Sequence, residues 1–169
     1  MPTNNSDYYL GNPNLKKVGT DINFTKEQIA EYLKCKEDPV YFAMNYIKII
    51  SLDEGIVPFK MWDFQQELIE SFHEHRFNIA KLPRQTGKST TCVSYLLHYV
   101  LFNDNVNVGI LANKLSTARD LLGRLQLAYE QLPMWMQQGI ITYNKGSMEL
   151  ENGSKILAAS TSASAVRGM

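Results

Sequence analysis

A short polar segment near the middle of the chain separates two apolar segments. The first apolar segment runs from Phe77 to Leu82, the second runs from Val93 to Phe102, and Gly87-Lys88-Ser89 lies between them. The first has the length of a buried strand, and the second has the length and spacing of a helix. The sequence therefore predicts a strand, a tight turn and the start of a helix.

The predicted turn has the chemistry of a loop that holds the phosphates of a nucleotide. Successive backbone N–H groups at a helix N-terminus can meet several negative charges, and Gly87 lets the main chain approach them closely. Lys88 is placed to reach the β- and γ-phosphates, and the Ser89 hydroxyl is placed to bind Mg²⁺. We therefore predict an ATP–Mg²⁺ site formed by Gln85, Thr86, Gly87, Lys88 and Ser89, with Thr90 at its margin.

The loop differs from the general pattern G-x-x-x-x-G-K-[ST] at the first glycine, which is Leu82 in this chain. A Gly-Lys-Ser turn that begins an ordinary helix is the alternative interpretation. The predicted strand before the turn and the helix after it lie where a phosphate-binding loop needs them, and they favour nucleotide binding.

The composition excludes several other classes of protein. With 169 residues, 44% of them hydrophobic, the chain can bury one sizeable core. Its 17 basic and 17 acidic residues cancel, so any contact with DNA has to be local or made by other residues. Cys35 and Cys92 are too far apart for a zinc motif, and no apolar segment is long enough to span a bilayer. We therefore expect an intracellular, soluble protein with no membrane partner.

The chain divides into three regions. Residues 1–23 are rich in Asn, Gly and Pro, and we expect an irregular arm there. Residues 24–55 are predicted to form a small helical appendage, in which Thr25 begins one helix with a capping box and Asp38 caps the next. Residues 56–169 carry the predicted phosphate loop.

Upstream of the loop, Asp63 is predicted to cap a helix whose apolar face is Phe64, Leu68 and Phe72. Downstream, residues 106–112 have the composition of a second strand. A strand, a helix and a strand with short connections form a βαβ unit, so we expect the strands at 77–82 and 106–112 to be parallel in one sheet.

After a further helix capped by Ser116, the periodicity changes to two. Residues 140–143, 148–150 and 155–158 are predicted strands, and Asn152-Gly153 is a strong hairpin turn. We therefore expect a β-meander that decorates the parallel sheet, followed by an open loop over residues 161–169.

Six segments in this order are similar to the large terminase subunit of tailed bacteriophages, particularly the T4-like group. An Arg-Gln pair before Gly-Lys is that family's own form of the loop, which accounts for the missing glycine. The resemblance runs from about Asp38 to Met169, and its segments are Asp38-Pro39-Val40-Tyr41-Phe42, Trp62-Asp63-Phe64-Gln65-Gln66, Arg84-Gln85-Thr86-Gly87-Lys88-Ser89, Val108-Gly109-Ile110-Leu111-Ala112-Asn113-Lys114, Leu150-Glu151-Asn152-Gly153-Ser154 and Ala165-Val166-Arg167-Gly168.

The resemblance implies an α/β fold: a P-loop NTPase core of the ASCE type, with a parallel sheet and flanking helices. It makes the chain the N-terminal part of the ATPase motor that packages viral DNA into the procapsid. Lys88 and Ser89 would hold phosphates and Mg²⁺, and Gln65 would read the adenine edge. Arg84 would stabilise the γ-phosphate within the same subunit, which makes Arg84 and Lys88 the catalytic candidates. Arg167 lies in a matched segment but has no assigned role.

The resemblance also implies partners and a location. In that family the motor is a homo-oligomeric ring that works with the portal protein, the small terminase subunit and double-stranded DNA. It acts in the host cell cytoplasm, docked on the procapsid, and is not part of the mature virion.

In the family, the Walker B aspartate and the glutamate that activates water follow the Arg-Gly segment, and a nuclease domain comes later. The chain stops at Met169 before reaching them, so the predicted fold is incomplete. Glu149 and Glu151 precede that segment, and we expect them at outward hairpin positions. Because phosphoryl transfer needs a positioned metal and a positioned water, we expect the chain as given to bind nucleotide without hydrolysing it. A helicase or translocase fragment and a non-catalytic nucleotide-binding or docking module are the alternatives.

Overall fold

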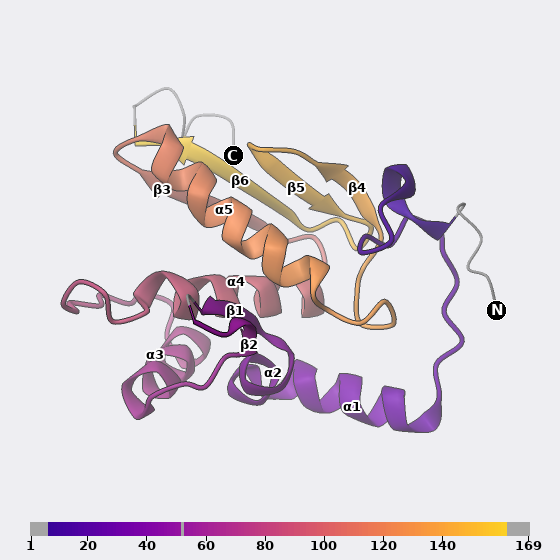
Figure 1. The fold of residues 1–169 in the computed structure, drawn as a ribbon, viewed down its shortest axis with the longest axis horizontal. Helices are drawn as coiled ribbons and strands as arrows, with labels where there is room; N and C mark the ends of the chain where they lie inside the picture. The colour runs from indigo at the N-terminus through magenta and orange to yellow at the C-terminus, as the bar shows by residue number, and fades with distance from the viewer. Residues whose placement is uncertain (1–6, 52, 162–169) are drawn as a thin grey trace.

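A computed structural model describes residues 7–51 and 53–161, which form an α/β fold of helices and a mixed sheet (Figure 1). Before the first long helix there is a short 3₁₀ helix, Tyr9–Gly11. The remaining elements are α1 (Lys26–Glu37), α2 (Pro39–Tyr46), β1 (Lys48–Ser51), β2 (Gly55–Pro58), α3 (Asp63–Glu74), α4 (Lys88–Phe102), β3 (Asn107–Ala112), α5 (Leu115–Glu130), β4 (Ile140–Tyr143), β5 (Ser147–Leu150) and β6 (Lys155–Ser160).

The main sheet has four strands in the order β3-β6-β5-β4. Strands β4, β5 and β6 are antiparallel neighbours, which confirms the predicted meander. The last of them, β6, also pairs in parallel with β3, so the meander is continuous with the sheet. Gly153, in the turn between β5 and β6, has φ +81°, a conformation that glycine adopts without strain. The predicted Asn152-Gly153 turn therefore joins β5 to β6.

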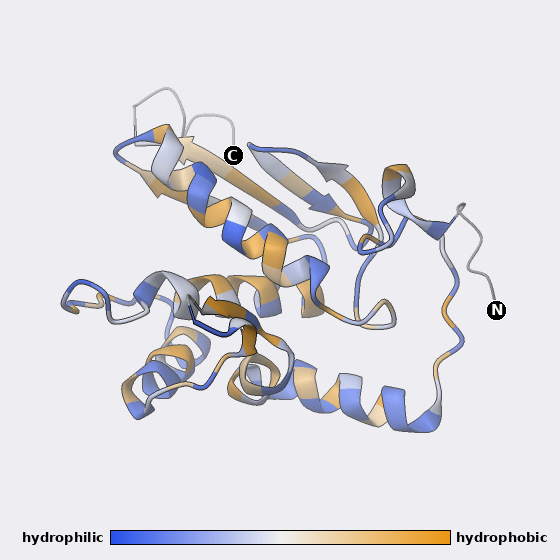
Figure 2. Cartoon of the chain, in the orientation of Figure 1, coloured by the Kyte–Doolittle hydropathy of each residue, from blue (hydrophilic) through white to orange (hydrophobic). Residues whose placement is uncertain are grey.

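The helices form layers beneath this sheet (Figure 1). Helix α5 contacts β3 and β6 on one side and α4 on the other, while α2 and α3 pack against the far side of α4. Leu97 and Leu101 of α4 are buried together with Leu122 and Leu125 of α5. Figure 2 shows α4 in a mixture of hydrophobic and hydrophilic colours, and its buried residues include Val93, Leu97, Val100, Leu101 and Phe102.

The predicted strand at residues 77–82 does not form in the described structure. Those residues have no regular secondary structure, and the side chains of Phe77 and Ile79 are 83% and 100% exposed. A strand needs a neighbour for its backbone hydrogen bonds, and no described strand pairs with this segment. The predicted βαβ unit is therefore also wrong: the parallel partner of β3 is β6.

Two of the predicted helix caps are confirmed. Thr25 and Gln28 form the predicted capping box at the start of α1, with each side chain accepting a hydrogen bond from the other's backbone N–H. The Asp38 carboxylate accepts from the Tyr41 backbone N–H at 2.8 Å and begins α2, whose first residue is Pro39. These caps depend on residues three positions apart, so the sequence is sufficient to locate them.

Two other caps are wrong. Asp63 lies inside α3, and the N-cap is Trp62, whose backbone N–H donates to the side chain of Gln65. Gln65 thus satisfies the helix end, and the carboxylate of Asp63 is not needed for it. Ser116 likewise lies inside α5, where the N-cap is Lys114.

The buried face of α3 also differs from the prediction. Gln65 and Ile69 are its buried residues, whereas Phe64, Leu68 and Phe72 are only half-buried. A polar residue on the buried face is invisible to hydrophobic periodicity, because the pattern places polar residues on the solvent side.

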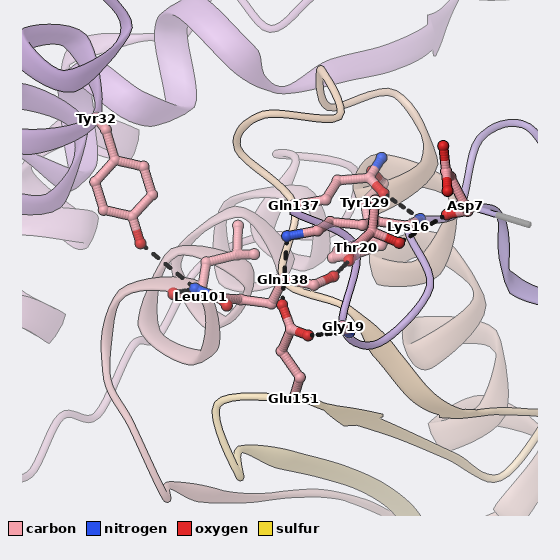
Figure 3. A network of polar contacts seen from close by, with 10 residues as sticks. All are labelled: Asp7, Lys16, Gly19, Thr20, Tyr32, Leu101, Tyr129, Gln137, Gln138 and Glu151. Carbon is pink, nitrogen blue, oxygen red and sulfur yellow. Dashed lines mark hydrogen bonds and ion pairs between the residues drawn. The ribbon is translucent and has the colours of Figure 1, made fainter. Parts of the chain in front are cut away.

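The N-terminal arm packs against the sheet (Figure 3). Leu15 is buried, and Lys17 forms a parallel bridge with Ile140 at the start of β4. The side chain of Gln137 accepts from the Lys16 backbone N–H at 3.0 Å and donates to the Asn14 carbonyl at 3.0 Å. Within residues 7–23 the arm is thus anchored to the sheet at Leu15 and Lys16, while most of its other residues are exposed.

Glu151 is part of this packing, so its predicted outward position is wrong. Its carboxylate lies 3.3 Å from the Lys16 ammonium and accepts from the Gly19 backbone N–H at 3.1 Å. Partial burial acts to raise the pKa of Glu151, but the Gly139 and Gly19 amides and Lys16 outweigh it and hold the pKa below its ordinary value. Glu149 instead pairs with Lys155 at 2.7 Å.

A β-hairpin that the sequence reading did not anticipate joins α2 to α3. Strands β1 and β2 pair antiparallel within residues 48–58 and form a separate two-stranded sheet. Among the described residues, no helix combines the length and apolar character needed to cross a membrane.

Candidate functional site

The segment from Arg84 to Thr90 forms a turn that leads directly into α4. Gln85 and Gly87 have φ angles of +63° and +74°, so two left-handed residues flank Thr86. Such local backbone curvature gathers successive N–H groups into a concave surface that can hold an anion. Gln85 adopts this conformation although it is not glycine, which is the kind of local strain that occurs at ligand-binding loops. The turn and the helix start that the sequence predicts are present, without the predicted strand before them.

The backbone N–H groups of Arg84 to Thr90 donate to no acceptor within residues 7–51 and 53–161. The next one, that of Thr91, donates to the Gly87 carbonyl at 3.0 Å and begins the regular hydrogen bonding of α4. The N-cap, Gly87, has no side chain to satisfy the free groups. Free donors at a helix N-terminus, together with the helix dipole, are an arrangement that can accept an anion.

The ammonium group of Lys88 points back into the loop. It donates to the Leu82 carbonyl at 3.2 Å and also to the carbonyl of Pro83. No carboxylate lies within 4.0 Å of it among the described residues. Burial raises the pKa of the nearby Cys92 thiol, and the positive charge of Lys88 opposes that shift. The loop thus holds an unneutralised positive charge on its inner side.

The structure gives the other candidate residues of the loop different degrees of exposure. Arg84, Gln85 and Ser89 are exposed, and Thr90 is half-buried. The Arg84 guanidinium has no hydrogen bond or ion pair, and the Ser89 hydroxyl has no hydrogen bond, to any residue that the structure describes. The Thr86 hydroxyl donates to the Pro83 carbonyl at 3.0 Å and closes the turn. Arg84 and Ser89 are therefore free to contact a ligand.

Thr90 lines a groove of about 360 Å³ between β1 and α5. Lys48 and Arg124 contribute to the same groove, and neither has a carboxylate within 4.0 Å in the described structure. Sequence analysis did not identify these two cations, because they belong to no motif and approach Thr90 only through the packing of the hairpin and α5. The groove gives the loop an electropositive neighbour.

Gln65 lies directly beneath the loop although it is 21 positions away from Thr86. Its side chain is 5% exposed, and its Nε2 donates to the Thr86 carbonyl at 3.1 Å. Its Oε1 accepts from the Trp62 backbone N–H at 3.0 Å. The structure therefore brings the two predicted parts of the site together. Reading of an adenine edge by Gln65 stays a prediction.

The described residues contain no group of three or more His, Cys, Asp or Glu side chains that could hold a metal ion. Arg167, whose role the sequence left open, lies outside the described residues.

The candidate site is thus a loop with free backbone donors at the N-terminus of α4, whose later turns are buried. The model of a protein family described as "Terminase large subunit, T4likevirus-type, N-terminal" matches residues 79–169, which is more than half of the chain. The chain belongs to this family. Membership supports a role in phage DNA packaging, and large terminase subunits are generally ATPases. The matched region includes the whole loop, α4, α5 and the main sheet.

Proposed function

We propose that residues 84–90 bind the phosphates of ATP with Mg²⁺, as part of the motor of a phage terminase large subunit. The observation that carries this proposal is the set of free backbone N–H groups from Arg84 to Thr90 at the start of α4. A nucleoside triphosphate supplies the negative oxygen acceptors that these groups lack. The family membership, which the match to residues 79–169 shows, supports the choice of a nucleotide over other anions.

Lys88 and Ser89 have separate parts in this proposal. The Lys88 ammonium would exchange its contacts with the Leu82 and Pro83 carbonyls for phosphate oxygens, which are stronger acceptors because they are charged. The Ser89 hydroxyl, which is exposed, would supply one oxygen ligand to Mg²⁺. The metal would neutralise phosphate charge.

Calorimetric titration of the 169-residue chain with magnesium ATP tests this site. Lys88→Ala removes a charge-assisted contact worth about 1.5–3 kcal/mol, so the affinity should fall about ten- to 100-fold. Lys81→Ala is the matched control, because Lys81 is an exposed lysine just before the loop and should change the affinity less than about two-fold. Equal affinities for Lys88→Ala and the wild type, in folded protein, would refute the assignment.

We propose that Arg84 acts on the transition state within its own subunit. Its guanidinium is exposed, lies on the loop and has no partner among the described residues, so it is available to a γ-phosphate. A contact that strengthens as charge develops lowers the barrier more than it tightens substrate binding. In a terminase subunit that hydrolyses ATP, Arg84→Ala should lower kcat at least about 100-fold and change KM only a few-fold. A raised KM with kcat retained would make Arg84 a ground-state contact.

We further propose that the protein works in a homo-oligomeric ring with the portal protein, the small terminase subunit and double-stranded DNA, on the procapsid in the host cytoplasm. Membership of the terminase family supports this proposal. Co-purification with the portal protein tests it, and failure of the full-length subunit to bind the portal would contradict it.

A further inference from the structure

The buried side chain of Gln65 connects the start of α3 to the phosphate loop. Its amide oxygen accepts from the Trp62 backbone N–H, and its amide nitrogen donates to the Thr86 carbonyl, at 3.0 Å and 3.1 Å. Only 5% of the residue is exposed. A buried amide whose two ends are both hydrogen-bonded is held in one orientation, because each lost bond would leave a buried polar group unsatisfied.

This orientation determines where the next backbone N–H points. In a trans peptide the C=O and the following N–H point in opposite directions. Because Gln65 holds the Thr86 carbonyl toward α3, the Gly87 N–H points away from α3. That N–H is one of the groups with no acceptor in the described structure. Gln65 thus aims one of the donors that the proposed function requires.

The space around Gly87 agrees with a close fit between the two residues. A Cβ atom added at Gly87 would lie 2.5 Å from Nε2 of Gln65, and the φ angle of +74° also favours glycine. The loop backbone therefore rests directly on the Gln65 amide, and no side chain separates them.

We propose that Gln65 is a positioning residue for the phosphate loop, which acts on phosphate binding whatever base the ligand carries. This inference rests on the proposed function, because it names how the same loop is held ready. It differs from reading an adenine edge, since it acts through the loop backbone and not through a contact with the base. The two hydrogen bonds use one N–H and one oxygen lone pair of the Gln65 amide and hold it against the loop.

Two ligands distinguish positioning of the phosphate loop from reading of the base. They are magnesium ATP, and magnesium tripolyphosphate, which has no base. Gln65→Met removes both hydrogen bonds without adding charge, and Gln65→Glu keeps an acceptor for Trp62 but loses the donor to Thr86. In each variant the affinities for the two ligands should fall by the same factor: at least about ten-fold, the value of one lost hydrogen bond, and more for Gln65→Glu, because its carboxylate also repels phosphate. Gln66→Glu is the matched control, because Gln66 has no side-chain hydrogen bond to the described residues and should change neither affinity by more than about two-fold.

A fall in ATP affinity with unchanged tripolyphosphate affinity would overturn the inference and make Gln65 a base-reading residue. If the wild type binds neither ligand, the proposed function itself fails, which is a different result. NMR of the wild type tests the same inference if the variants do not fold. The side-chain N–H₂ resonances of Gln65 should move with the Gly87 amide when tripolyphosphate is added and stay in place when adenosine is added. The reverse pattern would also overturn the inference.

Discussion

The two ends of α4 differ in whether the protein itself supplies hydrogen-bond partners for the free backbone groups. At its C-terminal end, protein side chains meet the free carbonyls: Asn152 donates to Val100 at 2.9 Å, and Gln138 donates to Leu101 at 3.2 Å. At its N-terminal end, the backbone N–H groups of Arg84 to Thr90 have no acceptor within the described residues. A helix end that the protein satisfies serves the fold, whereas an end with open donors and a nearby ammonium is suited to a ligand.

The largest expected effect is a loss of folding stability at acid pH, and it arises at His98 in the C-terminal half of α4. His98 is 1% exposed, its Nε2 lies 2.9 Å from the Cys35 carbonyl, and its Nδ1 has no partner in the described structure. Burial lowers the pKa of His98 to about 4, with a smaller contribution from His73, while the bond to Cys35 opposes the shift.

The unfolded chain therefore takes up a proton on this histidine near its ordinary pKa of about 6.5, and the folded protein does so only near 4. The stability from keeping His98 neutral is complete above pH 6.5 and is lost as the pH falls toward 4. Between about pH 7 and about pH 4.5 the free energy of unfolding should fall by about 2–3 kcal/mol from this residue. Urea unfolding of wild type and His98→Gln checks this: the variant should lose that part of the pH dependence, and exposed His75→Gln should keep it. Parallel profiles for all three proteins would contradict the expectation.

The next largest effect is a loss of folding stability at the C-terminal end of α4, where side chains bind the free carbonyls. Asn152→Ala removes the donor to the Val100 carbonyl and to the Asn103 carbonyl, at 2.9 Å and 3.1 Å. The Val100 carbonyl would lose its donor, whereas the Asn103 carbonyl keeps its bond from the Ser154 hydroxyl at 2.7 Å, so the free energy of unfolding should fall by about 1–2 kcal/mol. The affinity for magnesium ATP should not change, because the turn lies at the other end of the helix. Asn107→Ala, at an exposed position without a side-chain hydrogen bond in the described structure, is the control for unfolding. Loss of ATP binding in folded Asn152→Ala would show that the two ends are coupled.

The smallest expected effect concerns the N-terminal end of α4. A single substitution there should raise the free energy of unfolding and lower the affinity for magnesium ATP. Thr90→Glu places a carboxylate in the first turn of α4, where the helix dipole should stabilise it by about 0.5 kcal/mol. The same charge repels phosphate, so the affinity for magnesium ATP should fall at least about five-fold. Ser116→Glu makes the same change in the first turn of α5 and should affect stability alone. Stabilisation by Thr90→Glu with unchanged ATP affinity would place the nucleotide elsewhere.

The comparison between the two ends also shows what could be predicted from the sequence. The meander, the Asn152-Gly153 turn and the caps at Thr25 and Asp38 depend on residues close together in the chain, and all were predicted correctly. The strand at 77–82 failed because a parallel strand depends on a distant neighbour, which the described residues do not provide.

For the candidate site, the Gly87-Lys88-Ser89 motif was sufficient to locate the loop, because glycine and the helix start are local features. The contact between Gln65 and the Thr86 carbonyl could not be predicted from the sequence, because hydrophobic periodicity gives no partner for a polar side chain 21 positions away. Lys48 and Arg124 were missed for a similar reason: they reach the groove beside Thr90 only through tertiary packing.

The central claim is that the free N–H groups at the start of α4 hold phosphate, and backbone amide NMR tests it most directly. On titration with magnesium ATP, the amide resonances of Gln85 to Ser89 should move more than any others in the chain, with a common dissociation constant. Lys88→Ala should weaken that constant about ten-fold or more. Resonances that stay in place at Gln85 to Ser89 while those of Arg119 and Lys145 move would contradict the claim and place the nucleotide phosphates in the groove between α5 and the turn from β4 to β5.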